Sequence, residues 1–575
     1  MSLMSSLYTG TSGLRVSQSA INTTAHNLAN VDTRGYSRQQ VNIIDGKYQN
    51  IGRNNISTFQ VGMGTDIQQI YIFRNVFYDK AYRENNGRLG FYTAQNEAVN
   101  EIENLFGEME GVQFQESISG LWKSLQNLSN NPSDIVVRAE FTSSCVSFVE
   151  RSKKIMNQLS EYQKSLNTNI TMQVDKVNEY GKKIAELNVK IAQAEAGGTQ
   201  KANDYRDERD NYLDELSNLV KISYYENKNG QVTVSIEGVN FVLDGSYNAM
   251  STTEVDEVSG MIKPVWKHLG GKDVFQEGET VSTENDNNMG YLKGLILGRG
   301  SKKADYTMIP KKPVREDFNT DAEFNAANAK YKDDLKEYNN TLGVSTVMRV
   351  QAQLDRLVHG IVTTINDVLC PNKTIIDPVS GKEIKVLDVE NAPIGMDSEK
   401  KAGVELFVRN NMERYTEKVI GGKTYLVYNE EDASNPYSLY TIDQISVNNE
   451  ILNNNSKLPL SDKNGVGHDQ KVCDALTQKW NEAFEMLTPE SLTKFNFNSY
   501  YTNMIGELSN VGNQFLKLAQ TQQLALNTID GERMAVSGVS SDEELTNMIR
   551  FQHAYNANSR YITTVNDMLE TLLNL

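Results

Sequence analysis

Two helical stripes at opposite ends of the chain constrain its fold more than any other feature. Near the N-terminus, apolar residues recur every seven positions, at Leu7, Leu14, Ile21 and Leu28. At the C-terminus, residues recur at steps of three and four, at Met548, Phe551, Tyr555, Asn558, Ile562, Val565, Leu569 and Leu572. A stripe of this period follows one side of a helix and must be buried against another helix. Because chain ends normally fray, we predict that the two terminal helices pair with each other and with copies of themselves.

The N-terminal stripe lies on a segment with very little charge. Besides His26, its only formal charge is Arg15. The side of the helix opposite the leucines is mostly Ser, Thr, Asn and Gln. Small polar side chains allow helices to approach closely on several sides, which favours burial within an assembly. We predict that this helix ends where Asn30, Asp32 and Gly35 cluster. Short β-strands are expected after it, at Val41, Ile43, Ile67, Ile70 and Ile72.

The composition indicates a large protein with several domains. The chain has 575 residues, 39% of them hydrophobic, which is enough for three or four domains with apolar cores. It contains no long apolar run and no basic stretch followed by an apolar one, so we expect neither membrane insertion nor an ordinary secretory signal. The net charge of -17 disfavours a nucleic-acid partner, because neutralising phosphates needs a basic surface.

The three cysteines do not predict a disulfide framework. Cys145, Cys370 and Cys473 are an odd number with no CxxC spacing. Cys145 falls within a helical apolar pattern, where a small buried hydrophobic residue is the simplest interpretation.

The central part of the chain predicts a very long helix. Pro132, Ser133 and Asp134 form a helix-start signal. The apolar steps that follow are Phe141, Cys145, Phe148, Ser152, Ile155, Leu159, Tyr162, Leu166, Ile170, Val174, Val177, Tyr180, Ile184, Leu187, Ile191 and Ala194. A helix over about 134–196 would be on the order of 90 Å long at 1.5 Å per residue, which is a rod.

A second helix should return along this rod. Gly197 and Gly198 interrupt the pattern, which resumes over 205–219, so an antiparallel helical hairpin is predicted. Next, Asn229 and Gly230 separate two alternating apolar stretches, which is a strong β-hairpin signal.

The remaining segments alternate between helical and strand-like patterns. Residues 302–340 are rich in charge and are interpreted as an insertion with a short exposed helix, after which a helix is predicted over 347–369. Strands are expected over about 371–455, with turns at Ser380 with Gly381 and at Gly421 with Gly422. The final helical run should begin near Lys471 and include Phe484, Leu487, Ile505, Leu508, Val511 and Leu518 before the closing stripe.

These patterns predict a mainly α protein with β-rich insertions (α+β) that is elongated and multidomain. Residues 1–75 with 520–575 would form a terminal helical coiled coil. Residues 76–370 with 471–519 would form a long helical bundle with a β-hairpin, and residues 371–470 an outlying β-rich domain. Because both ends are helical, the termini should lie together at one end of the molecule.

One stretch carries a specific resemblance. Residues 27–39 read Asn-Leu-Ala-Asn-Val-Asp-Thr-Arg-Gly-Tyr-Ser-Arg-Gln. This resembles the signature of bacterial flagellar rod, hook and hook-associated proteins, which commonly have proline or alanine where Arg34 stands. The motif would be a helix end followed by a turn, with Gly35 in a backbone conformation that other residues resist and Tyr36 packing back. The predicted assembly interface therefore adds Asn30, Gly35 and Tyr36 to the stripe residues.

Three further stretches resemble the member of this family that joins the hook to the filament. They are the run Asp-Tyr-Arg-Asp-Glu-Arg-Asp over 204–210, the run from Gly290 to Arg299, and residues 537–575. The resemblance implies a structural subunit that forms a homo-oligomeric ring between the hook protein and hook-associated protein 3. It also implies export through the flagellar type III apparatus to the cell exterior, and a cytoplasmic export chaperone on the C-terminal helix.

Other functions were weighed against this one. Hook protein and hook-associated protein 3 are alternatives within the family, and an adhesin or hydrolase in the central region is an alternative from another class. No enzymatic motif has the required spacing: no HExxH occurs, and the Gly422-Lys423-Thr424 stretch lacks the glycine of a phosphate-binding loop, because Glu417 stands there. We therefore expect no catalysis, no metal and no cofactor.

Two polar features of the stripes allow more than one interpretation. His26 and His553 could sense pH, although a plain interface or surface histidine is the simpler interpretation. Asn558 could fix helix register, or could be tolerated at a wet position. The opposite charges of the two ends favour their pairing: 1–60 carries five Lys and Arg against two Asp, and 520–575 carries three Arg against seven acids. Exposed ion pairs contribute little, so burial of the stripes must supply most of the energy.

Overall fold

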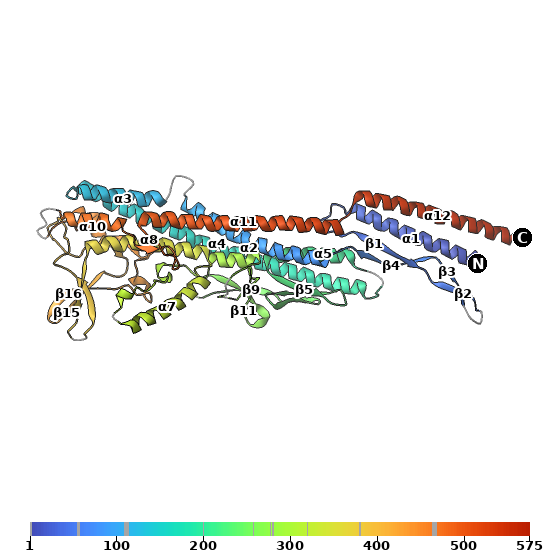
Figure 1. The fold of residues 1–575 in the computed structure, drawn as a ribbon, viewed down its shortest axis with the longest axis horizontal. Coiled ribbons are helices and arrows are strands. Elements are labelled where there is room, and N and C mark those ends of the chain that lie inside the picture. Colours follow the sequence, from blue (N-terminus) through green and yellow to red (C-terminus); the bar gives the residue numbers. More distant parts are fainter. Residues whose placement is uncertain are drawn as a thin grey trace.

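The computed structural model describes residues 3–53, 58–107, 114–198, 201–256, 258–276, 278, 281–318, 320–378, 381–462 and 468–574. The molecule is elongated, and the N- and C-termini lie together at one end (Figure 1). A β-rich region that includes β15 and β16 lies at the opposite end. The predicted α+β class and the placement of the termini are therefore confirmed.

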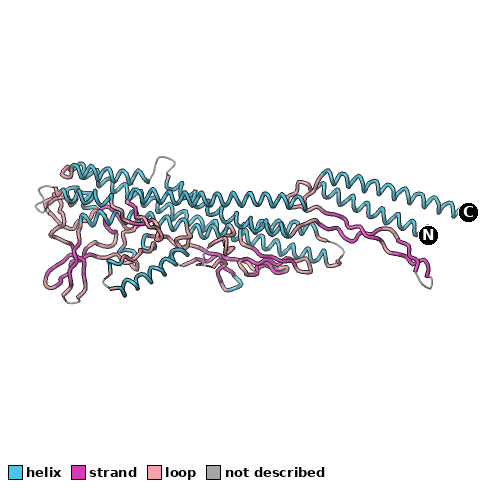
Figure 2. The backbone as a smooth tube through the Cα atoms, viewed as in Figure 1, coloured by secondary structure: helices cyan, strands magenta, loops and turns pink. Residues whose placement is uncertain are grey.

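The terminal region consists of two helices and two strand pairs. Its helices are α1 (Leu3–Ala29) and α12 (Ser541–Leu573). Its strands are β1 (Gln39–Asp45), β2 (Tyr48–Arg53), β3 (Thr58–Gly62) and β4 (Thr65–Ile72), and β1 pairs with β4 and β2 with β3, both antiparallel. Figure 2 shows these strands running alongside the two helices. The strands predicted around Val41 and Ile70 are present.

A bundle of long helices, which we call the rod, forms the middle of the molecule. Its members are α2 (Val76–Phe106), α3 (Phe114–Asn130), α4 (Ile135–Glu195), α5 (Asn203–Leu219), α6 (Tyr291–Arg299), α8 (Thr346–Leu369), α10 (Gln470–Asn481) and α11 (Phe497–Ser537). Helix α4 has 61 residues and begins as predicted, because the Asp134 side chain accepts a hydrogen bond from the Val136 backbone N–H at 2.8 Å. All predicted inward positions on α4 are buried except Tyr162, Tyr180 and Ala194. The apolar pattern predicted these buried positions because the side chains on one face of a helix recur at regular steps along the sequence.

Two small sheets pack against the rod. Strands β5 (Ile222–Glu226), β6 (Val232–Ile236), β7 (Val239–Leu243) and β8 (Ser246–Tyr247) form one sheet in that order. Strands β9 (Met250–Glu254), β10 (Ile262–Trp266) and β11 (Lys272–Asp273) form the other, with β10 in the centre. The predicted hairpin is β5 with β6, in which Ile222 faces Ile236 and Gly230 adopts a φ of 79°.

The β-rich outer end combines a four-stranded sheet with a two-stranded one. The strands β12 (Asn372–Ile376), β13 (Glu383–Leu387), β15 (Tyr415–Ile420) and β16 (Lys423–Tyr428) have the order β12-β13-β16-β15. Strand β14 (Phe407–Arg409) pairs with β17 (Ile445–Val447), and the short helix α9 (Asn449–Asn453) follows. The Gly421–Gly422 turn is present between β15 and β16. Ser380 of the other predicted turn lies outside the described residues.

The charge-rich insertion contains the predicted exposed helix. Helix α7 (Asp321–Asn340) has 20 residues, and of these only Tyr338 is buried. It begins at a capping box, in which Glu323 N–H donates to the Thr320 hydroxyl and Thr320 N–H donates to the Glu323 carboxylate.

The helical prediction for Phe484 and Leu487 is wrong. Helix α10 ends at Asn481, and the chain then forms the short pair β18 (Glu485–Met486) with β19 (Lys494–Phe495). Pro489 cannot supply a helical N–H. Phe484 instead packs its ring on Phe497 of α11, at 4.6 Å between centroids. Tertiary packing of an aromatic residue was mistaken for helical periodicity.

The largest hydrophobic core runs through both the rod and the outer end. It joins α4 and α8 side chains such as Phe148 and Leu357 with Phe407, Tyr440 and Ile445 of the outer end. The domain boundaries given above remain a prediction. Cys145, Cys370 and Cys473 are buried and unpaired, and the expected hydrophobic role of Cys145 is confirmed by its complete burial. Within the described ranges, no helix has the length and apolar character needed to cross a membrane.

Candidate functional site

The two terminal helices lie side by side and run antiparallel (Figure 1). A Cβ atom on Gly10 would lie 2.7 Å from Ile562, and one on Gly13 would lie 2.5 Å from the Asn558 side chain. Further along, Asn27 Nδ2 donates a hydrogen bond to Glu544 Oε2 at 3.0 Å. As residue numbers increase along α1, the residues that they contact on α12 have decreasing numbers. These contacts fix the register of the antiparallel pair.

The most deeply covered face of α1 is made of small residues. Its buried members are Ser5, Gly10, Ser12, Val16, Ser17, Ala20, Thr23, Thr24 and Asn27. The stripe residues Leu7, Leu14, Ile21 and Leu28 are only half-buried, at the margin of this face. The small residues were predicted to allow close approach, but the sequence did not show that they, rather than the leucines, form the contact centre.

The stripe on α12 is covered only in part. Val565 is buried, and Phe551, Tyr555, Asn558, Ile562 and Leu569 are half-buried. Leu572 is 59% exposed. Pairing within one chain therefore leaves part of the predicted interface uncovered.

Asn558 occupies the centre of the contact with α1. Its Nδ2 donates to the Ala554 carbonyl oxygen of its own helix at 2.9 Å. Its side chain faces Gly13, where a larger residue would not fit. Asn558 thus influences the helix contact through its shape.

Several large apolar side chains of the terminal pair face solvent. Met4 is 70% exposed, Ile549 55% and Leu573 84%. Tyr8, Leu545, Tyr561 and Met568 are also exposed. An exposed apolar surface of this kind is typical of a protein interaction site.

The segment after α1 forms a turn held by one amide. Asn27 donates to the Gln39 carbonyl oxygen at 2.8 Å and accepts from the Tyr36 hydroxyl at 2.8 Å. Gly35 has a φ of 77°, a conformation that favours glycine. The predicted backbone role of Gly35 and the packing of Tyr36 onto the helix end are both present. Asn30 caps the turn by donating to the His26 carbonyl oxygen at 2.9 Å.

This turn docks onto helix α5 of the rod. A Cβ atom on Gly35 would collide with Asn211 of α5. The backbone N–H and the hydroxyl of Ser37 both donate to the Asp207 carboxylate, each at 2.8 Å. Gln39 Nε2 donates to Asp204 at 2.8 Å. Two stretches that carry the family resemblance, 27–39 and 204–210, are therefore in direct contact.

A buried ionic cluster lies next to this contact. Its members are Arg74, Asp79, Arg83, Asp207, Asp210, Asp214 and Arg533. Arg533 of α11 bonds Asp79 of α2 at 3.0 Å and Asp214 of α5 at 2.9 Å. Four carboxylates share three guanidiniums, so most of the desolvated charge is compensated. The cluster joins α2, α5 and α11 where the rod meets the terminal pair.

The pKa values of two carboxyl groups in the cluster, Asp207 and Asp210, shift in opposite directions. Burial raises the pKa of Asp207 to about 6, and the hydrogen bonds from Ser37 and the charge of Arg74 offset this only partly. Burial would also raise the pKa of Asp210, but Arg74 and Arg83 hold it below its ordinary value. The ionised form of Asp207 is thus less stabilised by its surroundings than the ionised form of Asp210.

Sequence reasoning missed this cluster. One signal was available: Asp207, Asp210 and Asp214 recur at steps of three and four, which places them on one face of α5. Their partners Arg74 and Arg533 are distant in sequence, so only the fold could reveal the pairing.

The terminal helices offer exposed apolar surface suited to binding another chain. His26 is exposed and packs edge-on against Tyr36, and His553 is exposed. In the part of the chain that the structure describes, no three His, Cys, Asp or Glu side chains are grouped so as to hold a metal ion.

Three family models match the chain, and they follow one another along it. The "Flagella basal body rod protein" model matches residues 7–36, the "Flagellar hook-associated protein FlgK helical domain" model residues 99–370, and the "Flagellar basal body rod FlgEFG protein C-terminal" model residues 532–575. The outer two cover the paired terminal helices, and the middle one covers much of the rod. All three models are named for flagellar rod or hook-associated proteins, so the chain is similar to this family at both ends and along much of the rod.

Within this family, the chain is similar to flagellar hook-associated protein 1 over its whole length. The Bacillus subtilis (strain 168) protein of that name is 26% identical over 577 residues, which covers 99% of this chain and 97% of the relative. The Salmonella typhimurium protein is 23% identical, with 98% of each chain covered. A solved structure, the flagellar hook junction protein FlgK from Burkholderia pseudomallei, gives a TM-score of 0.46 at 13% identity over 80% of this chain and 100% of that chain.

Proposed function

We propose that this chain is a structural subunit of the bacterial flagellum that forms the junction between hook and filament and is needed for flagellar assembly and motility. Its role is mechanical, without catalysis or a cofactor. The unit comprising residues 1–75 and 520–575 would be the assembly unit, and the residues of the two stripes, with Asn30, Gly35 and Tyr36, its interface.

One observation carries this proposal: a single copy does not cover its own terminal helices. Ile549 and Leu573 of α12 and Met4 of α1 remain more than half exposed. Burying a large apolar side chain stabilises an assembly by about 1.5 to 3 kcal/mol. Neighbouring subunits that cover these residues would supply the energy of assembly.

The shape suggests how the subunit would sit in a ring. The terminal pair and the β-rich outer end lie at opposite ends of the molecule (Figure 1). We propose that the termini face the inner wall and the outer end faces solvent. The partners would be copies of this chain, the hook protein and hook-associated protein 3, without nucleic acid or membrane insertion. Export would use the flagellar type III apparatus, and a cytoplasmic chaperone would hold the C-terminal helix before export.

Deletion of residues 543–575 tests the proposal. We expect the truncated chain to fail both in incorporation into flagella and in chaperone binding, while its rod remains folded by circular dichroism. As a control, the hairpin formed by β15 and β16 is replaced by a short turn, which should leave incorporation intact. Immunogold labelling of isolated filaments locates the subunit and separates a junction from a hook or filament-proximal position.

Normal incorporation of the truncated chain would overturn the proposal. Label along the whole hook, rather than at its distal end, would indicate a hook protein instead.

A further inference from the structure

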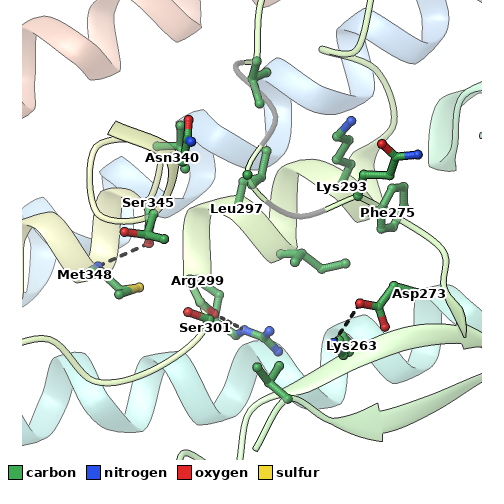
Figure 3. Close-up of a pocket in the computed structure, with 18 of the residues that line it drawn as sticks. Lys263, Asp273, Phe275, Lys293, Leu297, Arg299, Ser301, Asn340, Ser345 and Met348 are labelled. Carbon is green, nitrogen blue, oxygen red and sulfur yellow. Dashed lines mark hydrogen bonds and ion pairs between the residues drawn. The ribbon is translucent and has the colours of Figure 1, made fainter. Parts of the chain in front are cut away.

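A small cavity lies beside the rod, away from the terminal helices. Its volume is about 130 Å³, and it lies between helix α6, strands β10 and β11, and the start of α8 (Figure 3). Apolar side chains form much of its wall, including Phe275, Ile296, Leu297 and Met348. Basic side chains complete the wall, and two of these are Lys293 and Arg299 of α6.

Arg299 is buried at the cavity without a carboxylate partner. It is 1% exposed, and its guanidinium donates to two neutral acceptors, the Gly300 carbonyl oxygen at 2.9 Å and Asn167 Oδ1 at 2.6 Å. Among the described residues, no carboxylate forms an ion pair with it. Burial accordingly lowers the pKa of Arg299 to about 10. A buried cation in this state is costly unless an anion joins it.

Lys293 is a second buried cation in the same wall. It is 4% exposed and forms a long ion pair with the Glu237 carboxylate, at 3.9 Å. Its ammonium also lies 5.9 Å from the ring centre of Phe275. The third basic residue, Lys263, is paired with Asp273 at 2.8 Å. Because Lys263 and Lys293 each have a carboxylate partner, the uncompensated positive charge of the cavity wall comes from Arg299.

Several other buried arginines of this chain have a carboxylate partner. Arg83 bonds Asp214 at 2.6 Å, and Arg209 bonds Glu226 at 3.1 Å. Arg138 resembles Arg299 in lacking a carboxylate, but it binds the Pro132 and Leu458 carbonyl oxygens at 2.7 and 2.8 Å. Arg299 combines an uncompensated charge with an adjoining cavity.

We propose that this cavity binds a small amphipathic monocarboxylate, with the carboxylate held by Arg299 and the hydrocarbon chain against Ile296, Leu297 and Met348. An anion would compensate the buried guanidinium through charge-assisted hydrogen bonds. An apolar cavity of about 150 Å³ holds benzene, so a ligand of about six heavy atoms fits, which is a four-carbon acid. This inference is independent of the role in assembly.

Titration of the full-length chain with butyrate tests the proposal. Isothermal titration calorimetry should show saturable binding of one butyrate per chain, with a Kd on the order of 1 mM for so small a ligand. Two matched compounds separate charge from apolar contact: neutral butyramide and the purely polar anion sulfate. Each should bind at least about tenfold more weakly, because each lacks one of the two interactions.

Two variants locate the site. Arg299→Met removes the charge and Leu297→Trp fills the cavity, and each should abolish butyrate binding. Lys303→Met, which removes an exposed cation nearby, should leave binding unchanged. If Arg299→Met does not fold, Leu297→Trp and nuclear Overhauser effects between butyrate and the Ile296 and Leu297 methyl groups decide the question.

Three results would overturn the proposal. They are the absence of saturable butyrate binding to the unmodified chain, equal binding of butyramide or sulfate, and binding that persists when Leu297→Trp fills the cavity.

Discussion

The rod helix α4 and the terminal helix α12 have the same spacing of apolar residues but differ in how much of it one chain covers. Helix α4 buries 21 of its 61 residues, whereas α12 buries two of its 33, Glu544 and Val565. The α4 stripe meets α3, α5, α8 and the two sheets, whereas the α12 stripe meets α1. The same sequence pattern can thus complete a core within a chain or leave an interface for other chains.

The side chains that form the contacts within the rod also differ in kind from those between α1 and α12. In the rod, aromatic and aliphatic side chains interlock, as Phe114 does with Phe148 at 5.9 Å between ring centres. In the terminal pair, Gly10 and Gly13 allow α12 to approach, and hydroxyl and amide groups fill the face. Small residues give close contact but bury little apolar area, so this pair is held weakly in one chain.

The largest expected effect comes from the rod. Phe148→Ala should lower the free energy of unfolding by about 3 to 5 kcal/mol, because it leaves a cavity in a fully buried core. Ile562→Ala, its counterpart in the half-buried α12 stripe, should cost the isolated chain less than about 1 kcal/mol. Urea unfolding followed by circular dichroism measures both. Similar losses in the two variants would remove the distinction between rod and terminal pair.

The second largest loss of stability is expected in the buried ionic cluster, where the rod meets the terminal pair. Arg533→Met deprives the buried carboxylates Asp79 and Asp214 of one cation, which should cost about 2 to 3 kcal/mol because Arg74 and Arg83 remain. Arg550→Met on the exposed side of α12 is the matched control and should change little. Unfolding of both variants in urea provides the comparison. An unchanged midpoint for Arg533→Met would mean that the cluster does not hold the regions together.

A smaller and local effect is expected in the terminal pair. Gly13→Leu places a side chain where Asn558 lies, and should weaken the contact between α1 and α12 by about 2 kcal/mol. Amide exchange in α12 should become faster while α4 is unaffected. Gly120→Leu on α3, where an added Cβ meets no atom within 4 Å, is the control. Unchanged exchange in Gly13→Leu would argue against the observed register.

The last expected effect is a dependence of stability on pH through Asp207. Burial raises its pKa from 3.8 to about 6, so the folded state binds more protons than the unfolded state between these values. Stability should therefore fall as pH rises from about 4 to about 6, by at most about 1.4 kcal/mol per pH unit for one proton. Asp207→Asn should flatten this part of the profile relative to the exposed Asp204→Asn control. A parallel profile for the two variants would contradict the role of Asp207.

Much of the rod could be predicted from the sequence because its signals are local. Asp134 marks the start of α4, and apolar steps mark its buried face. The hairpin of β5 and β6 followed from Asn229 and Gly230. Local signals failed at Phe484, where a ring packs on α11 from outside a helix.

The candidate site could be predicted only in outline. The pairing of the two ends followed from their stripes, and the turn at Gly35 from its sequence. The contact of Ser37 with Asp207 and of Arg533 with Asp79 joins residues far apart in the chain. No local pattern encodes such contacts, because they depend on where the whole fold brings the segments.

Hydrogen–deuterium exchange of the isolated chain at micromolar concentration, compared with the assembled flagellum, tests the central claim most directly. We predict weak protection of α1 and α12 and strong protection of α4 in the isolated chain, with the terminal helices becoming protected on assembly. Strong protection of α1 and α12 in the isolated chain would contradict the account, because the terminal helices would then need no neighbours.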